Sequence, residues 1–199
     1  MIVLTCFFAY IIGSIPFGYI IAKIIKGVDI RNFGSGNIGA TNAARVLGKK
    51  WGILTFFLDF SKGLIAPFLI SLIIKEKIPM FYIFVSLSAI VGHNWSLFLK
   101  FKGGKGVATS IGVIAGLTLI FPPLVISFFL TIVLWAVVFF LFRYVSLASL
   151  IGGLSFFGIT LFLNVPCEIK IFSFLVFIFV VIRHKKNIGN LISKKELRF

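Results

Sequence analysis

Long apolar segments, separated by basic loops, run through almost the whole chain. They cover residues 2–22, 52–74, 80–99, 107–142, 145–165 and 169–182. Most are long enough to cross a bilayer as a helix. Of the 199 residues, 60% are hydrophobic, and the mean hydropathy is +1.15, which is more apolar surface than a soluble domain of this size can bury. Because backbone polar groups in lipid must be satisfied within each segment, the expected fold is all-α, with one integral membrane domain over residues 1–199.

The segment 107–142 decides the expected topology, because Pro122 and Pro123 interrupt it. If it were one bent helix, Arg143 and the basic C-terminal tail would lie on the same side as Lys75. If it is two helices, the long basic loops, Arg143 and the tail all lie on one side. An excess of Lys and Arg marks cytoplasmic loops. We therefore expect a polytopic membrane protein with seven transmembrane helices, its N-terminus outside and its C-terminus in the cytoplasm.

The formal net charge of +15 comes from 20 Lys and Arg against 5 Asp and Glu. In a soluble protein this excess of basic residues would indicate nucleic-acid binding. Here the basic residues lie between apolar segments, which favours anionic lipid or phosphorylated ligands as partners, and no nucleic acid. Cys6 and Cys167 form no zinc pattern. Both are expected near the outer face. They could form a disulfide or remain two free thiols, and free thiols are favoured.

A glycine loop, residues 100–106, lies between two apolar segments and holds three lysines and three glycines without an acid. Glycine allows another molecule to approach the backbone closely. Backbone amides beside lysines, ahead of a helix expected to start at Val107, suit a phosphate. The alternative is a tight basic turn. The loop lacks the G-x-x-x-x-G-K-[ST] pattern, so nucleotide is not its default ligand.

A second basic loop, residues 27–51, is called the first loop below. Its glycines Gly34, Gly36 and Gly39 match the dinucleotide pattern G-x-G-x-x-G. We reject that reading because the pattern requires a preceding strand and a parallel sheet. Arg31 and Arg45 offer planar forks for bidentate phosphate binding. An ordinary cytoplasmic connector with basic residues is the alternative.

Polar residues also occur within or beside the apolar segments. Asp59 and Lys62 are three residues apart, so they share a helix face and are expected to pair toward the protein interior. His93 and Asn94 directly precede the glycine loop, while His184 and Asn187 follow the last apolar segment. No acid or histidine cluster has metal-ligand spacing, and no Ser-His-Asp set is evident. We therefore expect a site that holds anions and stabilises charge, with no metal and no cofactor.

Seven motifs, taken together and in order, resemble the bacterial membrane glycerol-3-phosphate acyltransferases that use acyl phosphate as donor. The motifs are residues 13–18, 29–48, 59–63, 92–93, 101–109, 143–149 and 183–188. Three positions depart from the family: Ser96 replaces a frequent proline, Asn190 a usual basic residue and Lys194 a usual glycine. These departures concern the end of the third span and the contacts of the tail.

The resemblance implies a seven-helix inner-membrane protein whose active site faces the cytoplasm. It implies transfer of an acyl group from acyl phosphate to sn-glycerol 3-phosphate, giving lysophosphatidate and phosphate, the first acylation of phospholipid biosynthesis. Partners would be these two substrates and membrane lipid, with no obligate protein partner. The implied catalytic residues are Ser35, Arg45, Lys105, Ser146, His184 and Asn187. The implied substrate-binding residues are Asn37, Asn42, Asp59, Lys62, Gly103, Gly104 and Gly106.

The sequence leaves open which group accepts the hydroxyl proton. His184 is one candidate, and the phosphate of glycerol 3-phosphate, with a second pKa of roughly 6, is the other and the favoured one. Two other classes of protein are the alternatives. A transporter of phosphorylated anions would need a site near the midplane and usually an internal repeat, and neither is evident. A structural membrane protein would not need so many glycines and basic residues in its loops.

Overall fold

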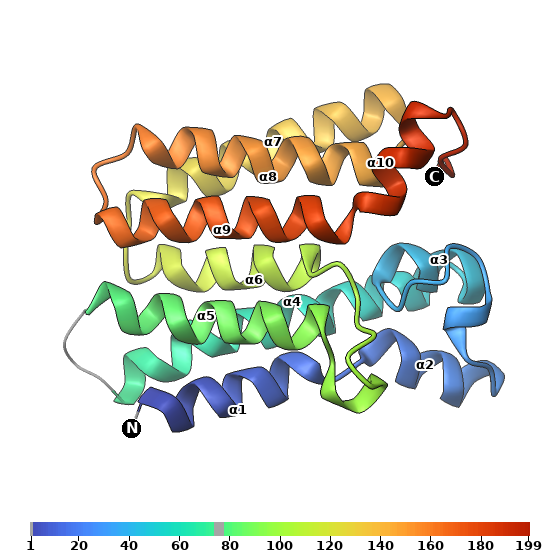
Figure 1. The fold of residues 1–199 in the computed structure, drawn as a ribbon, viewed down its shortest axis with the longest axis horizontal. Coiled ribbons are helices and arrows are strands. Elements are labelled where there is room, and N and C mark those ends of the chain that lie inside the picture. Colours follow the sequence, from blue (N-terminus) through green and yellow to red (C-terminus); the bar gives the residue numbers. More distant parts are fainter. Residues whose placement is uncertain (1, 74–77) are drawn as a thin grey trace. The chain divides into compact units, whose positions relative to one another are not determined.

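The computed structural model describes residues 2–73 and 78–199 and divides the chain into two compact units, Met1–Gly116 and Leu117–Phe199 (Figure 1). The described residues form helices and no strand, as the all-α expectation requires. The predicted outer loop that carries Lys75 falls partly outside them.

The first unit consists of six α-helices and two short 3-10 turns. In chain order they are α1 (Ile2–Ser14), α2 (Phe17–Lys26), η1 (Ile30–Asn32), α3 (Ala40–Leu47), α4 (Lys49–Ile73), α5 (Pro79–Asn94), η2 (Leu97–Leu99) and α6 (Val107–Thr118), which runs on into the second unit. The second unit consists otherwise of α7 (Leu124–Phe142), α8 (Val145–Leu161), α9 (Cys167–Arg183) and α10 (Lys185–Ile192).

Four helical stretches are long and apolar enough to cross a bilayer. They are Ile2–Lys26, which is α1 and α2 together, Lys49–Ser71, Pro79–Leu99 and Leu124–Phe142. α6 and α8 are shorter apolar helices. The apolar segment 107–142 is two helices, α6 and α7, separated at Pro122 and Pro123. The charge distribution favours two helices here, and the proline pair predicts the position of the break.

The first apolar segment is broken between Ser14 and Phe17, because Pro16 has no N–H to continue the helix. Next to the break, α1 packs directly against α5 (Figure 1). A Cβ at Gly13 would overlap the Ala89 carbonyl, and a Cβ at Gly92 would overlap the Tyr10 carbonyl. Small residues therefore allow the two backbones to touch, as is common between membrane helices.

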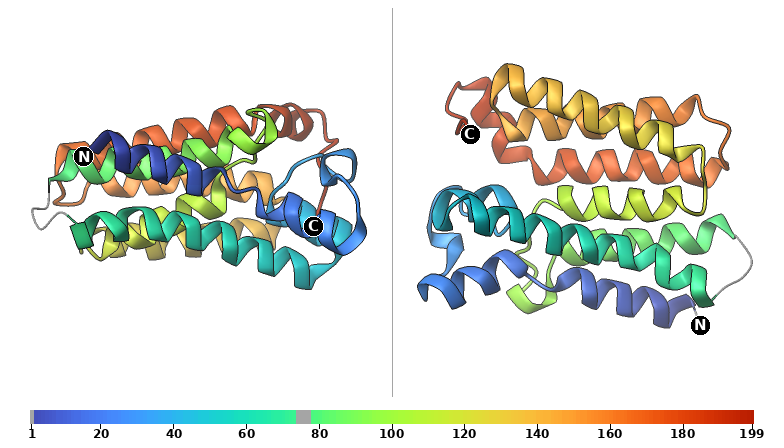
Figure 2. Two further views of the ribbon diagram at one scale, coloured as in Figure 1. Left: turned by 90° about the horizontal axis from the view of Figure 1, so that it is seen from below. Right: turned by 180° about the vertical axis from the view of Figure 1, so that it is seen from behind.

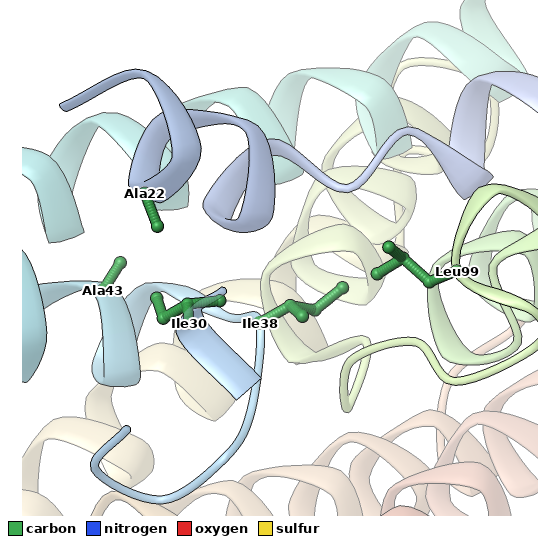
Figure 3. Close-up of a cluster of buried hydrophobic side chains, with 5 residues drawn as sticks. All are labelled: Ala22, Ile30, Ile38, Ala43 and Leu99. Atoms are coloured by element: carbon green, nitrogen blue, oxygen red, sulfur yellow. The ribbon is translucent and has the colours of Figure 1, made fainter. Parts of the chain in front are cut away.

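The first loop gathers at the end of the first unit that is remote from the N-terminus, as both views of Figure 2 show. Five buried apolar side chains hold it there: Ala22, Ile30, Ile38, Ala43 and Leu99 (Figure 3). Ala22 comes from α2, Ala43 from α3 and Leu99 from η2, directly before the glycine loop. This apolar cluster thus packs the first loop against the segment that leads into the glycine loop.

The second unit is held by aromatic packing and a few polar contacts. α8 packs against both α7 and α9. The rings of Phe156 and Phe172 meet edge to face at 6.5 Å between centroids, and the Trp135 indole donates to the Ser149 hydroxyl at 3.4 Å.

The two cysteines, Cys6 and Cys167, are free thiols.

Candidate active site

The first loop folds around the side chain of Asn42, which is 1% exposed. Its Oδ1 accepts the Ser35 N–H at 2.8 Å, and its Nδ2 donates to the carbonyls of Phe33 at 3.0 Å and Asn37 at 2.8 Å. A third carbonyl, that of Ile30, lies 3.3 Å from the same nitrogen. These bonds fix the Gly-Ser-Gly-Asn turn from within, so the Asn42 side chain is committed to the loop itself.

We predict that Asn42→Asp lowers the melting temperature of the purified protein strongly, although the side chain keeps its shape. A carboxylate would face three carbonyl oxygens that then lose their donor, and each buried unsatisfied group costs about 1–3 kcal/mol. The matched control is Asn32→Asp, an exposed position in the same loop, which should change the melting temperature little. Equal melting temperatures for the two variants would show that the Asn42 bonds do not hold the loop.

The predicted site residues of this loop take different positions around that turn. Gly34 and Gly36 have φ of 58° and 74°, which glycine adopts without strain. Asn37 accepts the Gly39 N–H through its Oδ1 at 2.9 Å. Ser35 is half-buried, and Arg45 is half-buried in the last turn of α3. The loop has no strand before it, which agrees with the rejection of a dinucleotide site.

Asp29 begins the η1 turn and pairs with Arg31. Its Oδ1 accepts the Arg31 N–H at 3.0 Å, and its Oδ2 lies 2.6 Å from the Arg31 Nη2. The hydrogen bond from the Arg31 guanidinium holds the pKa of the Asp29 carboxyl below its usual value, and the same bond raises the pKa of Arg31. Arg31 is thereby engaged by a carboxylate within the loop.

The lowered pKa of Asp29 predicts a pH dependence of stability. The pair stabilises the folded loop above the ordinary carboxyl pKa of 3.8, and this contribution is lost as pH falls through the lower folded value. Because both side chains are partly exposed, we expect about 0.2–1 kcal/mol. Melting curves of the protein and of Asp29→Asn should differ by a constant amount from neutral pH to about pH 5 and converge in stronger acid. A difference that grows in acid would contradict the assignment.

The glycine loop lies on the end of α5. The Gly104 N–H donates to the His93 carbonyl at 2.9 Å. A Cβ at Gly103 would overlap that same carbonyl, and one at Gly106 would approach the Asn94 Oδ1 to 2.5 Å. Glycine is therefore required at these positions by close packing, and Gly106 also has a φ of 75°.

The loop begins with a sharp turn and ends in a helix. Lys100 and Phe101 both have left-handed φ, 52° and 62°, and the Phe101 N–H donates to the Ser96 carbonyl at 2.8 Å. α6 then starts at Val107, as predicted. Lys105 is half-buried beside the glycines, whereas Lys100 and Lys102 are exposed. The loop thus places one partly buried lysine and several amides at a helix N-terminus, an arrangement that suits an anion.

Ser96, which replaces a frequent proline of the family, is buried and contributes to this region. Its hydroxyl donates to the Ser14 carbonyl at 2.5 Å, next to the break between α1 and α2. The Tyr10 hydroxyl donates to the Trp95 carbonyl at 2.9 Å. Both bonds tie the end of α5 to α1 just before the glycine loop.

Asp59 and Lys62 form the ion pair that their spacing predicts. The Lys62 Nζ lies 2.8 Å from the Asp59 Oδ1, and each side chain is 2% exposed. His93 is also buried, and its Nδ1 lies 3.5 Å from the same carboxylate oxygen. The structure therefore joins two predicted substrate-binding residues with a histidine directly beneath the glycine loop.

In the second unit, Ser146 and Asn187 meet on one carboxylate. The Ser146 hydroxyl and the Asn187 Nδ2 each donate to the Glu196 Oε1 at 2.6 Å. A second contact joins the C-terminal tail to the end of α7, where the Phe199 N–H donates to the Arg143 carbonyl at 2.9 Å. Glu196 was not among the predicted site residues, although an isolated acid in a basic tail was a usable signal.

His184 lies at the junction of α9 and α10 and is 2% exposed. Its Nδ1 lies 2.8 Å from the Val180 carbonyl. Since a carbonyl only accepts, this contact places a ring proton on Nδ1. Across residues 2–73 and 78–199, no group of three His, Cys, Asp or Glu side chains could hold a metal ion.

Comparison with known proteins identifies the family. A family model for glycerol-3-phosphate acyltransferase matches residues 3–194. The glycerol-3-phosphate acyltransferase of Aquifex aeolicus (strain VF5) is 43% identical over 192 residues, 96% of each chain. That of Desulforamulus reducens is 43% identical over 190 residues, 96% of this chain and 91% of the relative.

Solved structures agree with the sequence comparison. The crystal structure of PlsY, an integral membrane glycerol 3-phosphate acyltransferase, in its glycerol 3-phosphate form matches with a TM-score of 0.91 and 38% identity, covering 100% of this chain and 95% of that one. Its lysophosphatidic acid form matches with a TM-score of 0.88 and 37% identity over the same shares. Matched along nearly its whole length in both sequence and fold, the chain belongs to the family of integral membrane glycerol-3-phosphate acyltransferases.

Proposed function

We propose that the chain transfers an acyl group from acyl phosphate to the 1-hydroxyl of sn-glycerol 3-phosphate, with lysophosphatidate and inorganic phosphate as products. Family membership gives the acceptor and the reaction class, and the donor rests on the resemblance of the motifs. The solved relative PlsY has a glycerol 3-phosphate form and a lysophosphatidic acid form, which supports the same acceptor and product here.

One observation carries this proposal. One apolar cluster joins Ile38 of the first loop to Leu99, the residue directly ahead of the glycine loop (Figure 3). Arg45 lies two residues after Ala43 of this cluster, and Lys105 lies six residues after Leu99. Two phosphorylated substrates need two anion-binding groups close to each other, because their reacting atoms must come within about 3–3.5 Å. The shared cluster supports the proposal that the two loops provide these groups.

The reaction needs little from the protein beyond positioning and charge stabilisation. The 1-hydroxyl oxygen attacks the carbonyl carbon of the acyl phosphate, forming the ester C–O bond. The bond from that carbon to the phosphate oxygen breaks, and the phosphate leaves with the electron pair. Acyl phosphate is already an activated anhydride, so no nucleophilic side chain is required. Lys105, Arg45 and the loop amides would stabilise the charge that grows on the departing phosphate.

The hydroxyl proton would pass to the phosphate of glycerol 3-phosphate itself, with His184 orienting the substrate. We predict that His184→Ala lowers kcat/KM by less than about 10²-fold, below the range expected for loss of a general base. The loss should come mainly from weaker binding or orientation. A complete loss of the chemical step with intact binding, restored by added imidazole, would instead identify His184 as the base.

The proposed setting is the bacterial inner membrane, with seven spans, the N-terminus outside and the site on the cytoplasmic side. The support is the separation of α6 and α7 at the proline pair. If both helices cross the membrane, all long basic loops lie on one side, as the positive-inside rule favours. Cysteine accessibility tests this directly: single cysteines at Lys49 and Lys185, both exposed, should react with an impermeant maleimide only after the cytoplasmic side is opened.

The function is tested with purified protein, labelled glycerol 3-phosphate and either palmitoyl phosphate or palmitoyl-CoA as the only donor. We expect labelled lysophosphatidate with palmitoyl phosphate alone. Arg45→Ala should abolish it, while Lys50→Ala, an exposed basic residue close by, should not. Product from palmitoyl-CoA instead, or no product from folded protein, would overturn the proposed donor.

A further inference from the structure

A buried charged network lies beneath the glycine loop. Asp59 and Lys62 of α4 are paired at 2.8 Å with 2% exposure each, inside one of the stretches long and apolar enough to cross a bilayer. Charges at such positions are costly and generally mark function. Their burial keeps both side chains from direct contact with a ligand at the exposed face of the loop.

His93 connects this pair to the glycine loop. On one side its Nδ1 lies 3.5 Å from the Asp59 Oδ1. On the other side its ring abuts Gly104, where a Cβ would overlap the His93 Nε2. The His93 carbonyl accepts the Gly104 N–H at 2.9 Å. The Gly104 N–H is thereby engaged within the protein, and His93 holds the glycine loop through both its backbone and its side chain.

Lys62 connects the same pair to the first membrane segment. Its Nζ donates to the Ile15 carbonyl at 2.8 Å and lies 5.5 Å from the centre of the Phe17 ring. Ile15 is at the break between α1 and α2, where its carbonyl also accepts the Phe17 N–H at 3.2 Å. The network thus spans three elements, and its other end is the glycine loop.

We propose that Asp59, Lys62 and His93 are positioning residues that hold the glycine loop in its phosphate-binding geometry. This inference rests on the proposed function, and it changes the expected role of Asp59 and Lys62 from substrate contact to support. The carboxylate orients the His93 ring, the ring fixes Gly104 from below, and Lys62 fixes the carboxylate. Loss of the network would weaken phosphate binding without touching the ligand.

A purely structural ion pair is the competing explanation, and a charge-neutral double variant separates the two. Removing one partner of a buried pair leaves an unpaired charge and destabilises strongly, whereas replacing both with apolar residues of similar size is often neutral or stabilising. Asp59→Leu combined with Lys62→Met should therefore stay folded, with a melting temperature above that of either single variant, although the Ile15 carbonyl loses its Lys62 donor. It also removes the carboxylate that faces His93.

Two measurements on this double variant are informative: the affinity for glycerol 3-phosphate and for inorganic phosphate by calorimetry, and hydrogen exchange over residues 100–107. We expect both affinities to fall at least about tenfold, as for loss of one charge-assisted contact, with faster exchange in the loop. The control is Ser86→Ala, a buried polar position on α5, the helix that also carries His93. It should change neither the affinities nor the exchange.

A folded double variant with unchanged affinity and exchange would overturn the inference. His93→Gln, which leaves the ion pair intact, provides the second test: weaker binding with an unchanged melting temperature supports the positioning role, and unchanged binding contradicts it. Neither readout depends on acyl transfer. If phosphate affinity and exchange change together while no acyl transfer is found, the proposed function fails and the positioning role stands.

Discussion

Replacing Lys105 with alanine is expected to lower kcat/KM for glycerol 3-phosphate by about 10²–10³-fold, the usual loss when one preorganised donor to a developing anion is removed. Lys105 is the half-buried lysine of the glycine loop, adjacent to the amides of Gly104 and Gly106. In that setting a charge-assisted bond to phosphate is stronger than it would be in water. The measurement is steady-state kinetics of lysophosphatidate formation by the purified variant.

The same loop supplies the control for this prediction. Lys102 is three residues away and exposed, so Lys102→Ala removes the same charge without removing a partly buried donor. It should change kcat/KM by only a small factor that disappears as ionic strength rises. Equal losses for the two variants would mean that the loop acts through its overall charge and not through a defined contact of Lys105.

The second large effect is expected for Gly103→Ala, which adds one methyl group. A Cβ at this position would overlap the His93 carbonyl and come within 2.8 Å of the Asn94 carbonyl carbon and oxygen. Because these are backbone atoms, the loop has to move. A displacement of about 1 Å in a positioned group can cost on the order of 10²-fold in rate. Kinetics should show this loss with a raised KM for glycerol 3-phosphate.

Glycines with free space around them give the matched controls. At Gly158 in α8 and Gly189 in α10, nothing lies within 4 Å of the added Cβ. Alanine there should leave activity unchanged and stabilise its helix by up to about 1 kcal/mol. If Gly103→Ala were as active as these variants, the close packing of the glycine loop on α5 would not matter for catalysis.

Elements governed by local rules could be predicted from the sequence. The apolar segments specify helices, the proline pair at 122–123 specifies the break between α6 and α7, and Pro16 specifies the break after α1. The i, i+3 spacing of Asp59 and Lys62 was sufficient to predict their pairing, which the structure confirms at 2.8 Å. Each of these rests on neighbours within one helical turn.

Contacts that join distant parts of the chain could not be predicted in this way. The commitment of Asn42 to four backbone partners depends on how the first loop closes around it. The meeting of Ser146 and Asn187 on Glu196 joins residues 50 positions apart. The position of His93 under Gly104 depends on the turn at Lys100 and on packing against α1. The sequence shows that these loops are basic. The contacts that hold them in place are evident only from the fold.

The central claim is that the first loop and the glycine loop together serve acyl transfer between two phosphorylated substrates. The most direct test counts both products in one reaction of purified protein with palmitoyl phosphate and glycerol 3-phosphate. We predict one inorganic phosphate for each lysophosphatidate, and no phosphate release above the uncatalysed rate when glycerol 3-phosphate is omitted. Phosphate release without the acceptor, or lysophosphatidate without equivalent phosphate, would contradict direct transfer from acyl phosphate at this site.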